Sequence, residues 1–163
     1  MGVSGCGKSS VGQALAAMLD ADFVEGDALH PAASIAKMAR GEPLNDDDRQ
    51  PWLEEICRTI TRIRAAGRGV VVSCSALRRA YRDQLRLAGP LDIVFLTGSR
   101  AVLAERMRRR AGHFMPLALL DSQLATLEDP TGEPDVVTID IDRPLIEVIG
   151  RAREAICRSP DLV

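Results

Sequence analysis

The sequence predicts an α/β protein in which a parallel β-sheet is covered by helices on both faces. Two observations carry this prediction. Short apolar runs alternate along the chain with longer segments whose apolar residues recur at helical spacing, and this alternation is typical of parallel sheets. In addition, the chain opens with MGVSGCGKSS, in which Gly2, Gly7, Lys8 and Ser9 match the phosphate-loop pattern G-x-x-x-x-G-K-[ST] at every fixed position.

Four strands are expected in this sheet. Two of them, Val70 to Val72 and Ile93 to Leu96, are unbroken apolar runs of the kind that parallel sheets bury on both faces. A short strand precedes Gly26, and another lies near the C-terminal end of the chain. The predicted strands cover residues 23–25, 70–72, 93–96 and 136–139.

The segments between the strands predict helices, because their apolar residues recur three and four positions apart. Pro31 suits a first helical turn, and Gly41 and Gly67 suit helix ends. Asp48 or a neighbouring residue is expected to cap the long third helix. The predicted helices cover about 8–19, 31–40, 49–66, 77–88, 100–110, 117–127 and 145–156.

The strand that normally precedes a phosphate loop is missing from this sequence. The loop normally follows a buried strand, but only Met1 precedes it. In this class of sheet that strand is usually central and would be the fifth. We therefore expect an apolar strand of about six residues to precede Met1 in the intact protein. Without it, the central slot would be empty and we would expect low stability and weak activity.

Composition narrows the classes of function. The 163 residues suit one domain, and 46% hydrophobic with 27% charged residues is typical of a globular protein. A formal charge of −2 gives no general attraction to nucleic acid or to anionic membranes, and no apolar run is long enough to span a bilayer. The four scattered cysteines and two histidines have no metal-site spacing, so reduced thiols and a cytoplasmic location are expected.

The phosphate loop predicts an ATP site. Its glycines allow backbone N–H groups to point at phosphate oxygens, Lys8 should reach the β- and γ-phosphates, and the Ser9 hydroxyl should bind Mg²⁺. Cys6 is expected only to fill a place that needs a small side chain. The loop residues predicted to contact ATP are Gly2, Ser4, Gly5, Cys6, Gly7, Lys8, Ser9 and Ser10.

The remaining motifs select among nucleotide-binding proteins. The chain has no N-K-x-D guanine signature and no apolar strand ending in an Asp-Glu pair, which argues against a GTPase and a motor ATPase. An Arg-rich helix follows the strand 93–96, and in a chain this small it favours a small-molecule kinase with a mobile lid.

Five longer stretches make the sequence resemble the phosphate-loop gluconokinases, in that family's order and spacing from Gly2 to about Ile149. They are GDALHP, KMARGEPLNDDDRQPWL, SCSALRRAYRDQLR, RMRRRAGHFMP and TIDIDRPL. The resemblance implies a single three-layer kinase domain over 1–163, with a helical lid at approximately 106–127. It also implies ATP-dependent phosphorylation of D-gluconate to 6-phospho-D-gluconate, and a homodimer.

Three residues in the first half of the chain are candidates for the acceptor site. Asp27 ends a strand beside the loop, where it would take the proton from the attacking hydroxyl or orient a Mg²⁺-bound water. His30, before Pro31, would bind substrate or cap a helix. The resemblance adds Arg49 as a ligand of the gluconate carboxylate.

Three further acceptor candidates follow the strand 70–72. Ser75 lies at the carboxyl edge of the sheet, and Arg78 and Arg82 are four residues apart on one helix face. One of these arginines suits the substrate carboxylate, and the sequence favours Arg82 over Arg78.

The lid supplies the last candidates. The net negative charge and the lack of interleaved aromatic residues argue against a nucleic-acid patch at the Arg-rich helix. Arg106 and Arg110 share a helix face and match lid positions of the family, where they would bind ATP. His113 lies at the lid turn, on the substrate side. Lys8, Asp27 and Arg106 are therefore the predicted catalytic residues.

Two alternatives stay open. Another small-molecule kinase, such as a shikimate or nucleoside-monophosphate kinase, is disfavoured because NDDDRQPWL has no counterpart there. A nucleotide-binding protein made inactive by loss of its first strand is the other alternative. In addition, Ser34 stands where the family usually has Asn, which shortens the reach of that side chain.

Overall fold

The computed structural model describes residues 1–109 and 117–157. All four predicted strands are present: β1 (Asp22–Glu25), β2 (Val70–Ser73), β3 (Ile93–Thr97) and β4 (Val136–Asp140). The predicted helices are also confirmed, and they are α1 (Lys8–Met18), α2 (Ala32–Ala39), α3 (Asp46–Ala65), α4 (Arg79–Arg86), α5 (Arg100–Arg109), α6 (Leu117–Thr126) and α7 (Leu145–Cys157). A short 3₁₀ helix, η1 (Gly26–Leu29), follows β1 and was not predicted.

The start of α3 shows how a local pattern fixes an element. Asn45, one residue before the acidic run, is the N-cap, and its side-chain oxygen accepts from the Asp48 N–H at 2.8 Å. The Asp48 carboxylate accepts in return from the Asn45 N–H at 2.8 Å, which completes a capping box. The sequence predicted Asp48 or a neighbouring residue as the cap; the cap is Asn45, and Asp48 is its reciprocal partner.

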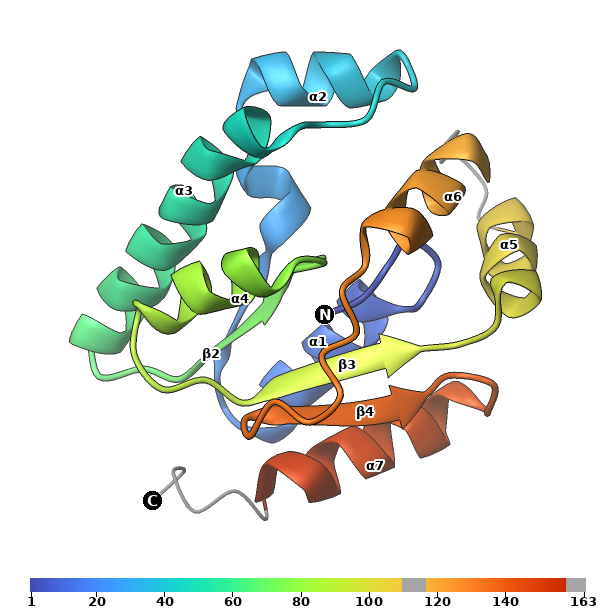
Figure 1. Ribbon diagram of the computed structural model, residues 1–163. Helices are drawn as coiled ribbons and strands as arrows, with labels where there is room; N and C mark the ends of the chain where they lie inside the picture. Colours follow the sequence, from blue (N-terminus) through green and yellow to red (C-terminus); the bar gives the residue numbers. More distant parts are fainter. Residues whose placement is uncertain (110–116, 158–163) are drawn as a thin grey trace.

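The helices form two layers, one on each side of the strands (Figure 1). Successive residues of β2 point to opposite faces: Val71 packs against the core that α1 and α7 share, whereas Val70 and Val72 pack against the core of α3 and α4. This alternation confirms the predicted three-layer α/β arrangement.

The described strands form two parallel pairs rather than one continuous sheet. β1 pairs with β2, and β3 pairs with β4. Between β2 and β3 lies a cavity of about 820 Å³, whose lining includes Val70, Val72 and Val94. The described residues place no strand there, as the sequence predicts for the central slot.

Met1 and Gly2 join the two pairs at the carboxyl end of this cavity. The Met1 amino group donates to the Val94 carbonyl at 2.5 Å, and the Met1 carbonyl accepts from the Leu96 N–H at 3.0 Å. On the other side, the Gly2 N–H donates to the Ser75 carbonyl at 3.2 Å. The phosphate loop is thus held at the sheet edge where strand ends and binding sites coincide in this class of fold.

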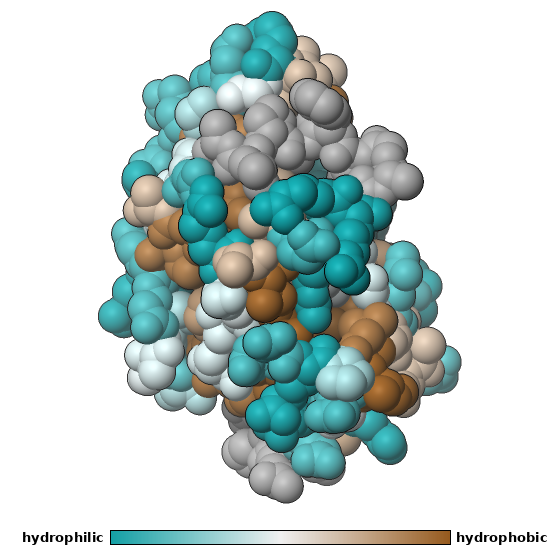
Figure 2. Space-filling model, turned by 90° about the vertical axis from the view of Figure 1, so that its right-hand side faces the viewer, coloured by the Kyte–Doolittle hydropathy of each residue, from teal (hydrophilic) through white to brown (hydrophobic). Residues whose placement is uncertain are grey.

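The surface mixes polar and apolar side chains. On the face shown in Figure 2, brown apolar areas lie between larger teal hydrophilic ones. Within residues 1–109 and 117–157, no helix is both long and apolar enough to cross a membrane.

Candidate active site

The phosphate loop adopts a backbone that only glycine tolerates at two positions. Gly2 has φ +139°, and a Cβ there would lie 2.5 Å from the Leu96 carbonyl oxygen. Gly5 has φ +83°, and its Cβ would lie 2.9 Å from the Leu103 carbonyl oxygen of α5. Because both atoms belong to backbone that cannot move aside cheaply, these glycines fix how closely the loop approaches β3 and α5.

The N-terminus of α1 is built to receive an anion. Its N-cap, Gly7 (φ +96°), offers no side chain to the first N–H groups, and the first turn carries no acidic residue. A Cβ on Gly7 would meet nothing within 4 Å, so the space beside it is open. Uncapped N–H groups and the positive end of the helix dipole favour a phosphate at this place.

The other loop residues lie where this role requires. The Lys8 ammonium donates to the Val3 carbonyl at 3.2 Å and so stays over the loop. Ser9 and Ser10 lie in the first turn of α1. Cys6 is buried in the core beneath the loop, in agreement with a packing role.

Asp27 and His30 follow β1 at the same edge of the sheet. Asp27 is exposed in η1, whereas His30 is only 9% exposed and stacks on Trp52 with ring centroids 4.3 Å apart. The Trp52 indole N–H donates to the Gly26 carbonyl at 2.7 Å, which fixes this ring. Burial lowers the pKa of His30, opposed by the charge of Asp27 and assisted by that of Arg49. The imidazole is therefore neutral near pH 7, and its Nδ1 has no partner among the described residues.

Arg49 and Arg78 gather around the buried ring of Tyr81. Their guanidinium carbons lie 5.6 and 6.0 Å from the ring centroid, respectively. Arg49 donates to the Leu44 carbonyl at 2.6 Å and to the Tyr81 hydroxyl at 3.4 Å. Arg78 pairs with the Asp46 carboxylate at 2.6 Å, and the Tyr81 hydroxyl donates to the same carboxylate. We call Asp46, Arg49, Arg78 and Tyr81 the Tyr81 cluster.

The charge balance of the Tyr81 cluster favours an anionic ligand. Two guanidinium groups face one carboxylate, which leaves an excess positive charge at a partly open place. Burial is the first cause that raises the pKa of Tyr81, and the bond to Asp46 adds to it, while both arginines oppose it. The phenol is therefore neutral near pH 7 and serves as a hydrogen-bonding group.

Helix α2 is fastened to the start of α3 beside this cluster. Ser34 is buried, and its hydroxyl donates to the Asp48 carbonyl at 3.4 Å. Lys37 pairs with the Asp48 carboxylate at 2.5 Å, and this bond is the first cause that lowers the pKa of Asp48. Ser34, where the family pattern has Asn, thus contacts the turn that carries Arg49.

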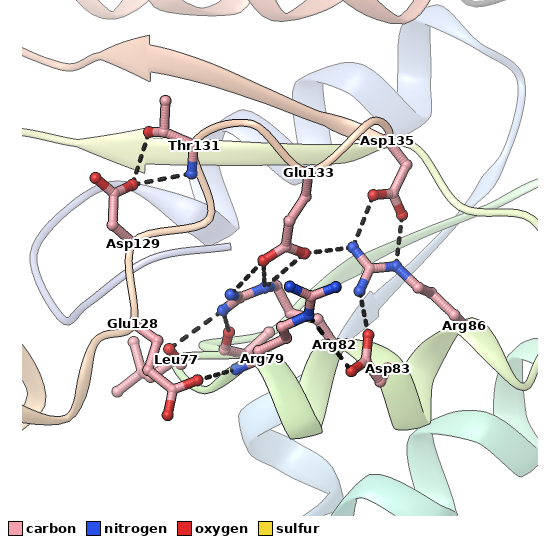
Figure 3. A network of polar contacts seen from close by, with 11 residues as sticks. Leu77, Arg79, Arg82, Asp83, Arg86, Glu128, Asp129, Thr131, Glu133 and Asp135 are labelled. Atoms are coloured by element: carbon pink, nitrogen blue, oxygen red, sulfur yellow. Dashed lines mark hydrogen bonds and ion pairs between the residues drawn. The ribbon is translucent and has the colours of Figure 1, made fainter.

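The structure does not bring Arg82 to the Tyr81 cluster. Its side chain is 1% exposed, and its Nε and one terminal nitrogen bind Glu133 at 3.0 and 2.5 Å (Figure 3). The other terminal nitrogen donates to the carbonyls of Ala76 and Leu77. The bonds from Arg82 are the first cause that lowers the pKa of Glu133 to about 2. These contacts favour Arg78 over Arg82 as a substrate ligand, the reverse of the order expected from sequence.

The remaining candidates lie near the loop or outside the described residues. Ser75 follows β2, and its carbonyl accepts from Gly2, so the acceptor side and the phosphate loop adjoin. Arg106, on α5, donates to the Ile141 carbonyl beyond β4 at 2.6 Å. Arg110 and His113 fall outside the described residues.

Sequence reasoning missed three residues that the structure places at these sites. Asp46 lies inside an acidic run that reads as a solvated helix start. Tyr81 carried a weak signal, because it lies three positions after Arg78 on one helix face. Gln123, on α6, accepts from the Ser4 N–H of the phosphate loop at 2.7 Å, and no local pattern marks it.

Comparisons with known proteins agree with this geometry. A family model described as an AAA domain matches residues 1–130. The thermosensitive gluconokinase of Escherichia coli (strain K12) is 44% identical over 158 residues, which cover 96% of this chain and 84% of that protein. A gluconokinase of Gluconobacter oxydans (strain 621H) is 50% identical over 141 residues, covering 85% and 79% of the two chains.

Solved structures give the same picture. A crystal structure of a gluconokinase from Sinorhizobium meliloti 1021 matches with a TM-score of 0.90 and 54% identity, covering 97% of this chain and 89% of that one. A structure of the Mycobacterium tuberculosis APS kinase CysC in complex with AMPPNP and APS matches with a TM-score of 0.63 at 19% identity, covering 96% and 94% of the two chains. At that identity the second match supports the fold alone.

Proposed function

This chain belongs to the gluconokinase family and to the AAA domain family of its matching model, and we propose that it transfers the γ-phosphoryl group of ATP to the 6-hydroxyl of D-gluconate. One observation of the structure carries the proposal beyond family membership. An uncapped phosphate loop adjoins, through the Gly2–Ser75 hydrogen bond, the end of β2, from which the chain continues to Arg78 and Tyr81; Arg49 of α3 lies against the same ring. The proposed triphosphate site and the proposed carboxylate site thus share one edge of the sheet.

On the nucleotide side, backbone N–H groups of the loop and of α1 would bind phosphate oxygens. The Lys8 ammonium, which now donates to Val3, would turn to the β- and γ-phosphates and neutralise their charge. Arg106 would add positive charge from α5 during transfer. Mg²⁺, when bound, would be held by the Ser9 hydroxyl with the phosphates and would neutralise charge on the transferred group.

On the acceptor side, Arg78 and Arg49 would bind the gluconate carboxylate, because both guanidinium groups face the Tyr81 cluster. His30 would bind a substrate hydroxyl once substrate binding exposes its Nδ1, which is buried and has no partner among the described residues. Asp27 would accept the proton of the 6-hydroxyl while the new O–P bond forms and the bond from the γ-phosphorus to the β-γ bridging oxygen breaks, releasing ADP.

The proposal also assigns roles to the arginines and the histidine outside the two binding sites, an oligomeric state and a location. Arg82 would position α4 rather than touch substrate, since every nitrogen of its guanidinium already donates to Glu133 or to a carbonyl. Arg110 and His113, which fall outside the described residues, would act from a lid at about 106–127 on the strength of the family resemblance. A homodimer is likewise proposed from the family resemblance. A cytoplasmic location fits the four free cysteines.

The decisive experiment is ADP release from Mg²⁺-ATP with D-gluconate, with shikimate, AMP and no acceptor as controls. We expect gluconate-dependent release, and phosphorus NMR of the product should show a phosphate monoester on the terminal carbon. Lys8→Met should abolish turnover while the far-UV circular dichroism spectrum stays unchanged. Release of ADP with shikimate or with AMP, but not with gluconate, would mean that gluconate is not the acceptor.

The cavity between β2 and β3 supports one alternative, a nucleotide-binding protein without catalysis. Folded protein that binds ATP in calorimetry, yet releases no ADP with any sugar acid, would identify that case.

A further inference from the structure

Helix α6 contacts the phosphate loop through Gln123, a residue that has no role in the reaction proposed above. The Gln123 side-chain oxygen accepts from the Ser4 backbone N–H at 2.7 Å, across 119 positions of sequence. Ser4 stands between the two glycines whose backbone fixes the loop against β3 and α5. The amide that Gln123 binds is therefore part of the loop's own scaffold.

Gln123 is well placed to hold the loop because α6, although it falls within the proposed lid range, packs against the core. Leu120 and Leu124 pack in the same core as Val3 and Cys6 of the loop. In Figure 1, α6 (orange) ends beside the dark blue loop. The hydrogen bond therefore joins two segments that are already packed together, so it adds orientation at little further cost in entropy.

The chain just after α6 is also tied to the segment that begins α4. The Glu128 N–H donates to the Leu77 carbonyl at 2.9 Å, and the Glu128 carboxylate accepts from the Arg79 N–H at 2.6 Å (Figure 3). These bonds anchor the chain just after α6 to the beginning of α4. The position of Gln123 is thus set by packing on one side and by backbone hydrogen bonds on the other.

On the basis of the proposed kinase activity, we propose that Gln123 is a positioning residue that holds the phosphate loop in its phosphate-binding shape through the Ser4 N–H. It does so from outside the loop, as an acceptor for a donor that would otherwise be unpaired. Without it, the loop has to be ordered when the nucleotide binds, and the cost of ordering weakens phosphate binding.

The test uses Gln123→Met, which keeps the length of the side chain and removes the acceptor. Gln123→Glu keeps an acceptor at the same place, and Gln13→Met makes the same exchange at an exposed position of α1. Four quantities are measured: hydrogen exchange of the Ser4 amide by NMR, affinity for ADP and AMP by calorimetry, KM for gluconate, and the melting temperature. ADP carries the β-phosphate that the loop binds, and AMP does not.

We expect Gln123→Met to lose protection of the Ser4 amide and to bind ADP about 5- to 10-fold more weakly, which corresponds to ~1 to 1.4 kcal/mol. AMP affinity, KM for gluconate and the melting temperature should change little. Gln123→Glu should keep the Ser4 protection, and Gln13→Met should match the parent protein in every measurement.

Unchanged or tighter ADP binding by Gln123→Met would overturn the proposal, as would equal weakening of ADP and AMP. If Gln123→Met fails to fold, retained Ser4 protection in Gln123→Glu still supports the role, and lost protection refutes it. Because ADP binds without a phosphoryl acceptor such as gluconate, these results do not depend on turnover of gluconate. Failure of the proposed function would appear separately, as normal ADP binding without phosphoryl transfer.

Discussion

Arg78 and Arg82 lie one turn apart at the start of the same helix, yet they belong to different kinds of site. Arg82 is 1% exposed and donates to Glu133 and to two backbone carbonyls. The side chain of Arg78 is 41% exposed, and its ion-pair partner Asp46 is 59% exposed. The comparison shows that the partners of a guanidinium, rather than its place on a helix face, separate a buried structural tie from an exposed group that is open to a ligand.

We call Arg82, Arg86, Glu133 and Asp135 the Arg82 region. It holds a distant part of the chain against α4. Glu133 accepts from both Arg82 and Arg86, and Arg86 also binds Asp135 at 2.7 Å (Figure 3). These contacts hold the segment that follows α6 against the helix that begins at Arg79. In the Tyr81 cluster, by contrast, the Asp46 carboxylate is exposed, and under the proposed function the carboxylate of the substrate would take its place.

The largest effect is expected from breaking the buried pair. Arg82→Ala should lower the free energy of unfolding by about 3 to 5 kcal/mol, because it leaves the Glu133 carboxylate buried without its main partner. Urea denaturation measures this loss. Arg79→Ala, on the exposed side of the same helix, should cost less than about 1 kcal/mol. Equal losses in the two variants would remove the distinction drawn here.

Arg78→Ala should change binding where Arg82→Ala changes stability. Loss of a charge-assisted bond to the gluconate carboxylate should raise KM for gluconate roughly 10- to 100-fold, or ~1.4 to 2.7 kcal/mol. Unfolding should change by less than about 1 kcal/mol, since the pair with Asp46 is exposed. Arg78→Lys should restore part of the affinity. A parent-like KM for gluconate in Arg78→Ala would exclude Arg78 as a ligand.

The dependence of stability on pH should come partly from the Arg82 region. The pKa of Glu133 is lowered in the folded protein, from 4.5 to about 2. Its contribution is therefore complete above pH 4.5 and is lost as the pH falls towards 2. The urea midpoint of the parent protein should decrease over this window. Glu133→Gln should be less stable than the parent above pH 4.5, should converge with it as the pH falls towards 2, and should therefore show a flatter dependence; an equally steep one would refute the assignment.

Sequence reasoning succeeded where the pattern was local. The strands, the helices and the loop from Gly2 to Ser9 depend on apolar spacing and on glycine positions, which can be read within about a dozen residues. The role of Arg82 could not be read in this way. Its partner Glu133 is 51 positions away, in a segment without periodicity, and only the packed structure brings the two together.

The candidate site shows the same difference between residues that a local pattern marks and residues that depend on distant contacts. The resemblance placed Arg49 near the substrate carboxylate, and the structure places it beside Tyr81, with no test yet of the ligand role. Asp46 and Gln123 were missed, since each acts only through contacts with a distant segment. A capping pattern predicted the start of α3 but could not predict that the residue after the cap reaches Arg78.

The smallest effect, and the finest test of the comparison, is expected from Asp46→Asn. The Asp46 carboxylate occupies Arg78 and accepts from the Tyr81 hydroxyl, so a substrate carboxylate has to compete with it. Removing its charge should lower KM for gluconate about 2- to 5-fold, a change of ~0.4 to 1 kcal/mol that is typical of an exposed pair. Steady-state kinetics over a range of gluconate concentrations measure it.

The same variant has a second readout in the phenol. Tyr81 is the one tyrosine in the sequence, so ultraviolet titration reports it alone. The bond to Asp46 and its charge both raise the pKa of Tyr81, although burial contributes more. In Asp46→Asn the pKa should therefore fall part of the way towards 10 and stay above it. A lowered pKa with a raised KM for gluconate would mean that Asp46 orients Arg78 for the substrate instead of competing with it.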